Sequence, residues 1–262
     1  MPPVARRHFL HAVGGFACCG VAGQLGATSP LWRYERTFGG LQVLADFVPR
    51  DLGCFDQLSR LRDDLRQALE LRLPDTLVRI LLFKDRARMR SYVRRTLPTA
   101  PDRRALFVHQ SHSSTIYISE GPSRQEDLRH EFVHALLHHS IPSIPLWLDE
   151  GLAEYFEVIP SLRTTREDYR LAIQAQLDNG TTVSLSHLEQ LRQVDQMQLV
   201  HYRQAWGWVH FLLHGCPAAR DELVRYLGDL GSGIPAGQLE RRLTQRVGRL
   251  QRRFREHFSV QA

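Results

Sequence analysis

The first part of the chain alternates between segments with strand-like and helix-like spacing of apolar residues. Short apolar or β-branched runs predict strands at Leu41–Ala45, Leu77–Phe83 and Ser114–Ser119. Apolar residues recur every three or four positions over Phe55–Leu71, which predicts an amphipathic helix, and a second helix is expected over Asp85–Leu97. This order of elements indicates a small α/β lobe.

The apolar pattern becomes helical almost throughout after Gly121. We therefore predict an α+β fold in which residues 28–121 form a small α/β lobe and residues 122–262 form a mainly helical lobe. One long amphipathic helix is expected near the C-terminal end, surrounded by arginines. Its apolar stripe consists of Leu239, Leu243, Val247, Leu250, Phe254 and Phe258.

Residues 1–27 predict an export signal. Arg6 and Arg7 precede an uncharged stretch, Phe9–Ala27, whose second half is rich in glycine and alanine, as in a secretory signal peptide. The run RRHFL at residues 6–10 also resembles the twin-arginine export signal. This hypothesis places the protein in the periplasm or outside the cell, with transient membrane contact through the signal. The alternative is a permanent membrane anchor, since the stretch is just long enough to span a bilayer.

The composition is that of a globular protein and excludes an intrinsically disordered or low-complexity chain. Of the 262 residues, 43% are hydrophobic and 24% are charged. Arg6 and Arg7 are the only charged residues of the predicted signal, so the formal net charge falls from +6 to +4 without it. We expect no nucleic-acid partner, and we favour a packed, solvated C-terminal helix over one that contacts a membrane or a nucleic acid.

Two of the four cysteines lie in the predicted signal, which leaves Cys54 and Cys216 in the mature chain. An oxidising compartment would allow these two thiols to pair. Two free buried thiols are an equally good interpretation of the sequence.

A metal-binding pattern lies on the first predicted helix of the second lobe, where residues 130–134 read HEFVH. His130 and His134 are four residues apart and therefore leave one face of the helix, so both imidazoles can bind one Zn²⁺ at about 2.0–2.1 Å. Glu131 points about 100° away, where it can deprotonate a water molecule at the metal without being a ligand. The pattern alone is of moderate weight, because the chain has 13 histidines.

A second helix is predicted over Asp149–Val158, after a turn that contains two prolines. A catalytic zinc site needs three protein ligands and one open position. A carboxylate from this second helix would complete the ligand set.

These two segments resemble the gluzincin metallopeptidases, in particular the peptidase-MA-like group of small bacterial zinc proteins. The resemblance rests on HEFVH and on the block PLWLDEGLAEYF, from Pro145 to Phe156, and it covers residues 121–156 strongly. It implies a zincin-like fold and identifies Glu150, the glutamate before the glycine of the block, as the third zinc ligand. Fifteen residues separate His134 from Glu150, fewer than in the aminopeptidase and thermolysin branches of the family. The resemblance therefore does not extend to the details of the substrate site.

Further residues are candidates for supporting roles. Glu154 lies one turn after the third ligand and is expected to orient a histidine through its other ring nitrogen, or else to be a solvated carboxylate. For His138 we favour an exposed helix end. Members of the family often place a tyrosine or histidine on a later helix, here Val200–Gly215, to stabilise the oxyanion. Tyr202 is the first candidate for this role and His201 is the second. An equally good interpretation of Tyr202 is a half-buried tyrosine that only packs in the core.

The resulting hypothesis is an exported zinc metallohydrolase, most simply a peptidase, that acts on a peptide or protein substrate with Glu131 as the base. The strand with Tyr117 is expected to lie along the cleft and to pair with an extended peptide. An aminopeptidase-type recognition motif does not precede HEFVH, which favours an endopeptidase or a narrow processing enzyme. The alternative is a non-catalytic module of the same fold that binds a metal or a peptide.

Overall fold

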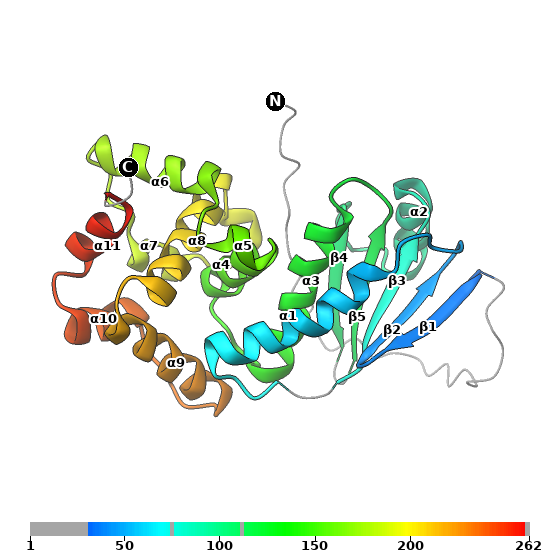
Figure 1. The fold of residues 1–262 in the computed structure, drawn as a ribbon, viewed down its shortest axis with the longest axis horizontal. Helices are drawn as coiled ribbons and strands as arrows, with labels where there is room; N and C mark the ends of the chain where they lie inside the picture. Colours follow the sequence, from blue (N-terminus) through cyan, green and yellow to red (C-terminus); the bar gives the residue numbers. More distant parts are fainter. Residues whose placement is uncertain (1–30, 74–75, 111–112, 260–262) are drawn as a thin grey trace.

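The computed structural model describes residues 31–73, 76–110 and 113–259 and shows a mixed α+β fold, as predicted (Figure 1). A five-stranded sheet is followed by a mainly helical region. The predicted export signal, residues 1–27, lies outside the described residues. Within the described ranges, no helix combines the length and the apolar character needed to cross a membrane.

The sheet has the strand order β1-β2-β3-β5-β4. Strands β2, β3 and β5 are parallel to one another, whereas β1 and β4 pair antiparallel at the two edges. The strands are β1 (Tyr34–Phe38), β2 (Leu41–Ala45), β3 (Val78–Phe83), β4 (Ala105–Gln110) and β5 (Ser113–Ser119). The three parallel strands are the three predicted from the sequence.

Both edge strands were missed, and the prediction of an edge position for the strand of Tyr117 was wrong. β5 lies between β3 and β4, so β4 is the outer strand on that side. β1 escaped detection because its central residues are polar and exposed, so it lacks the alternation of a half-buried strand. Its place in the sheet follows from its pairing with β2 rather than from its own pattern.

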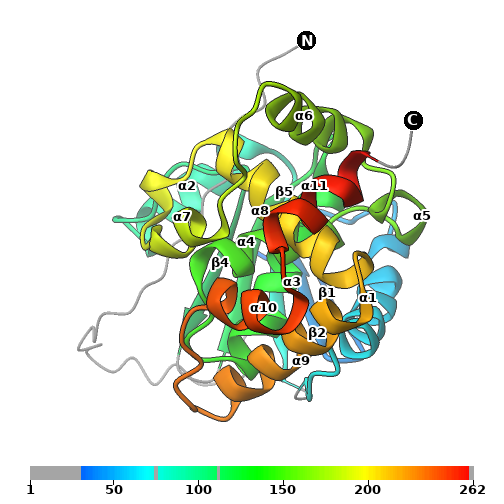
Figure 2. The ribbon, with the colours of Figure 1, turned by 90° about the vertical axis from the view of Figure 1, so that its left-hand side faces the viewer.

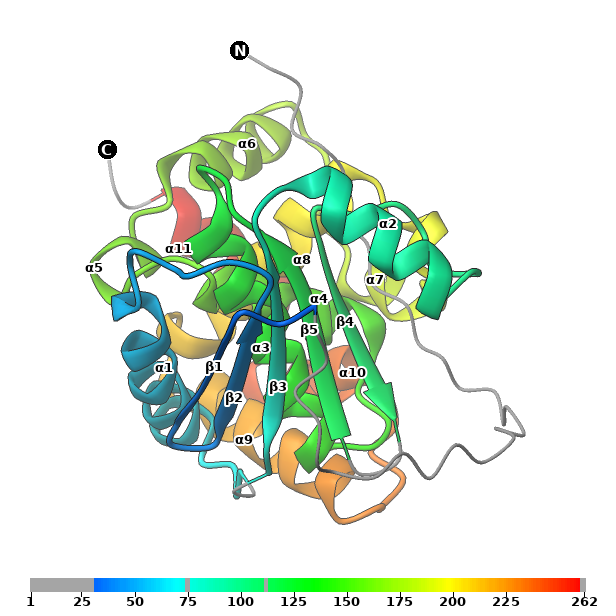
Figure 3. The same ribbon diagram turned by 90° about the vertical axis from the view of Figure 1, so that its right-hand side faces the viewer.

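Helices cover both faces of the sheet. α1 (Gly53–Leu69) and α3 (Arg124–Ser140) pack on one face, and α2 (Arg86–Thr96) packs on the other, in front of the sheet in Figure 3. The side chains of β3 alternate accordingly: Ile80 joins the core on the side of α1 and α3, and Leu81 joins the cluster beneath α2.

The remaining helices form the helical region seen in Figure 2, and α4 and α8 pack closely against each other at its centre. They are α4 (Leu146–Phe156), α5 (Pro160–Arg163), α6 (Glu167–Asp178), α7 (Leu185–Gln190), α8 (Leu199–His214), α9 (Pro217–Gly231), α10 (Leu239–Val247) and α11 (Leu250–Ser259). A short 3₁₀ turn covers Val194–Gln196.

The single C-terminal helix predicted from the sequence is two helices, α10 and α11. Gly248 and Arg249 separate them, and both have positive φ angles, 61° and 43°. A glycine adopts this region without steric cost, so the chain turns there. All six residues of the predicted apolar stripe are nevertheless buried, because each helix turns its own part of the stripe toward the core.

One hydrophobic core joins the sheet to the helical region. It extends from the inner face of the sheet through α1 and α3 to α4 and α8, where Trp147, Trp206 and Trp208 are fully buried. Cys54 is buried in this core and Cys216 is half-buried before α9; both are free thiols. The structure therefore supports the interpretation as free thiols and not the disulfide.

Gly151 allows the close contact between α4 and α8. A Cβ atom at this position would lie 2.8 Å from the carbonyl oxygen of Ala205 and 2.9 Å from Cγ2 of Val209. A backbone oxygen in a helix cannot move aside without disturbing the helix, so only glycine fits. The contact also determines how close the residues that flank Gly151 come to α8.

We expect Gly151→Ala to lower the free energy of unfolding by about 1–3 kcal/mol, although alanine forms helices better than glycine. The cause is overlap with the backbone of α8. The matched control is Gly228→Ala in α9, where the added methyl group meets nothing within 4 Å; there we expect a gain of about 0.5–1 kcal/mol. Urea unfolding of both variants is the measurement, and a gain in both would contradict the packing argument.

Candidate metal centre

Helices α3 and α4 bring His130, His134 and Glu150 together in the core. The Nε2 atoms of the two histidines are 3.1 Å apart. Oε2 of Glu150 lies 3.6 Å from Nε2 of His130 and 3.9 Å from Nε2 of His134. All three side chains are buried, and their ligand atoms lie close enough together to hold one metal ion.

The donor set fits a tetrahedral metal ion. Ligands at about 2.0–2.1 Å from Zn²⁺ in tetrahedral directions are separated by about 3.3 Å, near the distances between these three atoms. Glu150 supplies a second observation: its Oε1 atom is buried and has no hydrogen-bond partner among the described residues. A buried carboxylate without a full set of partners is costly, and a bound cation would remove that cost.

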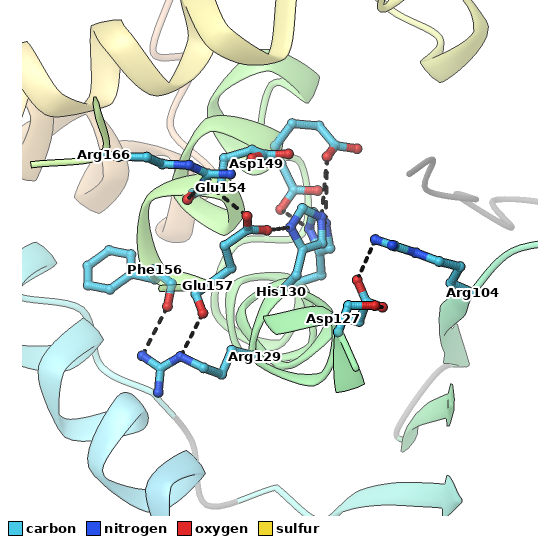
Figure 4. A network of polar contacts seen from close by, with 12 residues as sticks. Arg104, Asp127, Arg129, His130, Asp149, Glu154, Phe156, Glu157 and Arg166 are labelled. Carbon is cyan, nitrogen blue, oxygen red and sulfur yellow. Dashed lines mark hydrogen bonds and ion pairs between the residues drawn. The ribbon is translucent and has the colours of Figure 1, made fainter. Parts of the chain in front are cut away.

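A carboxylate contacts the outer nitrogen of each histidine. Nδ1 of His130 lies 2.9 Å from Oε2 of Glu157, and Nδ1 of His134 lies 3.0 Å from Oδ1 of Asp149 (Figure 4). With the proton on Nδ1, His130 donates a hydrogen bond to Glu157 and His134 faces Asp149 in a close ion-pair contact, and each ring keeps its Nε2 lone pair for a metal. Both rings are therefore held with the nitrogen that can bind a metal directed toward Glu150.

The orienting role predicted for Glu154 is taken by Asp149 and Glu157. Glu154 is buried, which also excludes a solvated carboxylate, and its Oε2 accepts hydrogen bonds from Tyr169 at 2.8 Å and Arg166 at 3.2 Å. Arg166 also lies 2.9 Å from Oε1 of Glu157, so one guanidinium links the two carboxylates. A sequence signal for Glu157 existed, since it lies seven residues after Glu150, two helical turns further along the same face.

The prediction that His138 lies at an exposed helix end was wrong. His138 is buried, and its Nε2 atom lies 3.0 Å from Oδ2 of Asp149. Asp149 thus contacts two histidines of α3, one with each oxygen. Burial alone would raise its pKa, but His134 and His138 hold the pKa of this carboxyl well below its ordinary value.

Arg129 fastens the end of α4 to α3. Its Nε atom donates to the carbonyl of Glu157 at 2.8 Å, and its Nη2 atom donates to the carbonyls of Phe156 at 3.1 Å and Val158 at 3.0 Å (Figure 4). These carbonyls lie at the C-terminal end of α4 and have no helical partner of their own. Arg129 precedes the first histidine of the motif, so this contact helps to set the distance between the ligands on the two helices.

The protonation of the cluster is coupled to metal binding. Burial acts to lower the pKa of His130, but hydrogen bonds with Glu150 and Glu157 raise it well above its ordinary value. The pKa of His134 is also raised, because Asp149 and Glu150 outweigh the effect of burial. A metal must displace these protons, so its affinity is expected to fall as the solution becomes more acidic.

Glu131 and Tyr202 both lie at the cluster. Burial raises the pKa of Glu131, while His130 and His134 act to lower it. Tyr202, on α8, is buried, and its pKa is raised first by burial and then by the negative charge of Glu150. The structure thus places this tyrosine in the core, close enough to the candidate ligands to sense their charge.

His201, the reserve candidate, has a different role. Its Nδ1 atom accepts the backbone N–H of Gln198 at 3.0 Å, which caps the N-terminal end of α8. The pKa of its neighbour along the helix, Tyr202, is instead raised by burial and in part by the charge of Glu150.

Arg103 is a charged residue of the site that the sequence did not reveal. It precedes β4, and burial lowers its pKa while Tyr202, Glu131 and Glu150 act to raise it. A guanidinium therefore lies near both the expected base and the third ligand. Its position depends on the pairing of β4 with β5, and no local motif in the sequence marks it.

No protein-family model matches this chain, and no curated protein matches it. Its function is therefore inferred from the geometry of the site and from the short motifs of the sequence.

We expect Glu157→Gln to weaken the affinity for Zn²⁺ by about ten- to hundred-fold, because His130 loses the charged partner that orients it and raises its basicity. Competition with a chelating dye measures the affinity. The matched control is Glu222→Gln in α9, a carboxylate that is equally buried but is paired with Arg242 and Arg246. An unchanged affinity in the Glu157 variant, or an equal loss in the control, would contradict the orienting role.

Proposed function

We propose that this protein is an exported zinc metallopeptidase with a zincin-like fold. The observation that supports the proposal most directly is the convergence of His130, His134 and Glu150, with an intact Glu131 beside them. The contacts of Asp149 and Glu157 with the two histidines match the support that zinc-binding histidines require. The resemblance of residues 121–156 to the gluzincins agrees with this donor set.

Zinc suits the site better than other common divalent ions, because two imidazoles and one carboxylate are a donor set typical of catalytic zinc and leave one position open. When bound, Zn²⁺ would polarise the scissile carbonyl and lower the pKa of a water molecule. His130, His134 and Glu150 would hold the ion. Their burial and outer-nitrogen contacts fix them before substrate arrives.

The remaining chemistry belongs to side chains of this chain. Glu131 takes a proton from the attacking water and delivers it to the leaving amine; its raised pKa brings it nearer to the range of an effective acid–base group. Tyr202 donates a hydrogen bond to the oxyanion, and its raised pKa keeps it protonated. The guanidinium of Arg103 adds positive charge beside both.

The outer strand β4, rather than β5, is the strand that would pair with an extended peptide. Its edge away from β5 is not paired with another strand of the described sheet. β4 also lies against the helix with the histidines, since the ring of Phe107 is stacked on that of His134 at 6.4 Å between centroids. Arg104, just before β4, bonds to Asp127 of α3 at 2.9 Å (Figure 4). A peptide along this edge would therefore run beside the cluster.

The second candidate is a non-catalytic module of the same fold that binds a metal or a peptide. Such a module needs the three ligands but not Glu131. Keeping a buried carboxylate at that position costs stability, because His130, His134 and Arg103 offset its desolvation only in part. A module without catalysis gains nothing from that cost, so the enzyme is favoured.

We expect the native protein to contain about one zinc ion per chain and to cleave an unfolded protein, and we expect a chelator to abolish the cleavage. Glu131→Gln should retain the zinc and lose activity by about 10²–10⁴-fold, because only the base is removed. His134→Ala is the control that should lose both zinc and activity. Elemental mass spectrometry and a fluorogenic casein assay are the measurements. Full activity in Glu131→Gln would exclude the mechanism, and a native protein that takes up no zinc would exclude the metal.

Tyr202→Phe should lower kcat by about 10²–10³-fold with little change in KM or zinc content, because the oxyanion loses one donor. His201→Gln is the control: it alters the adjacent residue, which caps α8, and kcat should remain near the native value. Steady-state kinetics on a cleavable peptide distinguish the two. A native kcat in the Tyr202 variant would show that the tyrosine only packs in the core.

A further inference from the structure

A second group of histidines lies in the helical region, apart from the candidate metal centre. His210 and His214 are on α8 and His257 is on α11, and all three line a pocket of about 510 Å³. Residues of α6, α8 and α11 and of the segment before α6 line the pocket. Helix α11 packs against α6 and α8, as Figure 2 shows. Its volume is within the range of about 300–1,000 Å³ that small-molecule sites occupy.

The hydrogen bonds of these histidines determine which nitrogens remain for a ligand. Nε2 of His210 donates to the carbonyl of Thr164 at 3.2 Å, so its Nδ1 accepts from Nε2 of His257 at 2.7 Å. Nδ1 of His257 is therefore a lone-pair acceptor. Nε2 of His214 lies 2.7 Å from the hydroxyl of Tyr155, and either group can be the donor; Nδ1 of His214 carries the proton when the tyrosine donates. Within the described residues neither Nδ1 of His214 nor Nδ1 of His257 is hydrogen-bonded.

Arg170 is one of the residues that line the same pocket. Nη2 of Arg170 is buried and has no hydrogen-bond partner in the part of the chain that the structure describes. An N–H group left in this state costs free energy, which a ligand that accepts the hydrogen bond would recover. Arg253 supplies a second, exposed guanidinium to the lining. The acid in the lining, Glu256, is already paired with Arg252 at 2.7 Å.

Burial keeps the histidines of the pocket neutral, so the positive charge of its lining comes from Arg170 and Arg253. Burial, together with His257 and His214, lowers the pKa of His210 to about 3. Burial and the nearby Arg170 lower the pKa of His257 to about 4, and burial lowers the pKa of His214. The ionisable groups around them are Arg170 on α6, Arg252, Arg253 and Glu256 on α11, and Tyr155 on α4, whose pKa burial raises to about 12.

We propose that this pocket binds a phosphate group, either as free phosphate or as a small organic phosphate monoester. A monoprotonated or diprotonated phosphate offers both acceptors and a donor. In the complex that we propose, Tyr155 donates to Nε2 of His214. The unprotonated oxygens of the phosphate accept from Arg170, Arg253 and Nδ1–H of His214, and its P–O–H group donates to Nδ1 of His257. Sulfate has the same shape and charge but no donor at neutral pH, so it leaves the acceptor of His257 without a partner.

The experiment titrates the full chain by calorimetry with inorganic phosphate, phenyl phosphate and sulfate, with zinc loaded and after chelation. We expect saturable phosphate binding that chelation does not change and that exceeds sulfate binding about ten-fold at about pH 5.5, where phosphate and a phosphate monoester both keep a proton. The affinity should fall between about pH 5.5 and pH 8.5, as the phosphate group loses this proton. Tighter binding of phenyl phosphate at the lower pH identifies an organic monoester as the ligand, and equal or weaker binding identifies free phosphate.

Arg170→Gln and Arg253→Gln should each weaken phosphate binding by about ten- to hundred-fold, because each removes a charge-assisted hydrogen bond. The matched control is Arg241→Gln, an exposed arginine on α10 outside the pocket, which should bind as the native protein does. Arg253 is exposed, so its variant tests the site even if the Arg170 variant folds poorly. Absence of saturable binding in the native protein, binding that disappears with zinc, or equal binding by the Arg253 and Arg241 variants would overturn the proposal.

Discussion

The burial of four carboxylates on one helix is the constraint on which the rest of the structure depends. Asp149, Glu150, Glu154 and Glu157 all lie on or directly after α4, and each is at most 3% exposed. So much negative charge is stable in a core only when each carboxylate has a positive or hydrogen-bonding partner. Histidines of α3 and the guanidinium of Arg166 supply these partners for three of the four. Glu150 has one oxygen, Oε1, without a hydrogen-bond partner among the described residues, while its Oε2 faces the Nε2 atoms of His130 and His134, where a cation would be held.

The same constraint explains why the neighbouring helices pack so tightly. The ligand atoms must stay within about 4 Å of each other across two helices, and side chains on loosely packed helices would not remain in register. Arg129 joins α3 to the end of α4, and Gly151 brings α4 against the backbone of α8. Tyr202 lies on α8, buried and close enough to Glu150 for the charge of that carboxylate to raise its pKa further. In the function that we propose, this packing prepares the site before substrate binds, so the active geometry requires no rearrangement of the core.

The histidines of the pocket have their pKa values shifted in the opposite direction from the histidines of the candidate metal centre. At the metal centre, carboxylates raise the pKa of His130 and His134, whereas around His210 and His257 burial and nearby cations lower it. The first environment attracts a cation and the second an anion. Both are attached to α4, the first through Asp149 and Glu150 and the second through the hydroxyl of Tyr155. The two sites that we propose, one for a cation and one for an anion, therefore both contact the same helix.

The spacing of residues along single segments was sufficient to predict α1, α2, α3, α4 and α8, the three inner strands, the α+β class and the pair of histidines. His130 and His134 share a helix face whatever the rest of the chain does. Folding adds the order of the strands, the break at Gly248, the position of Arg103 and the partners of the histidines. These depend on contacts between segments far apart in the chain. Asp149 and Glu154 are both acidic residues of α4, and only the packing of α3 and α6 against that helix assigns one to a histidine and the other to Tyr169.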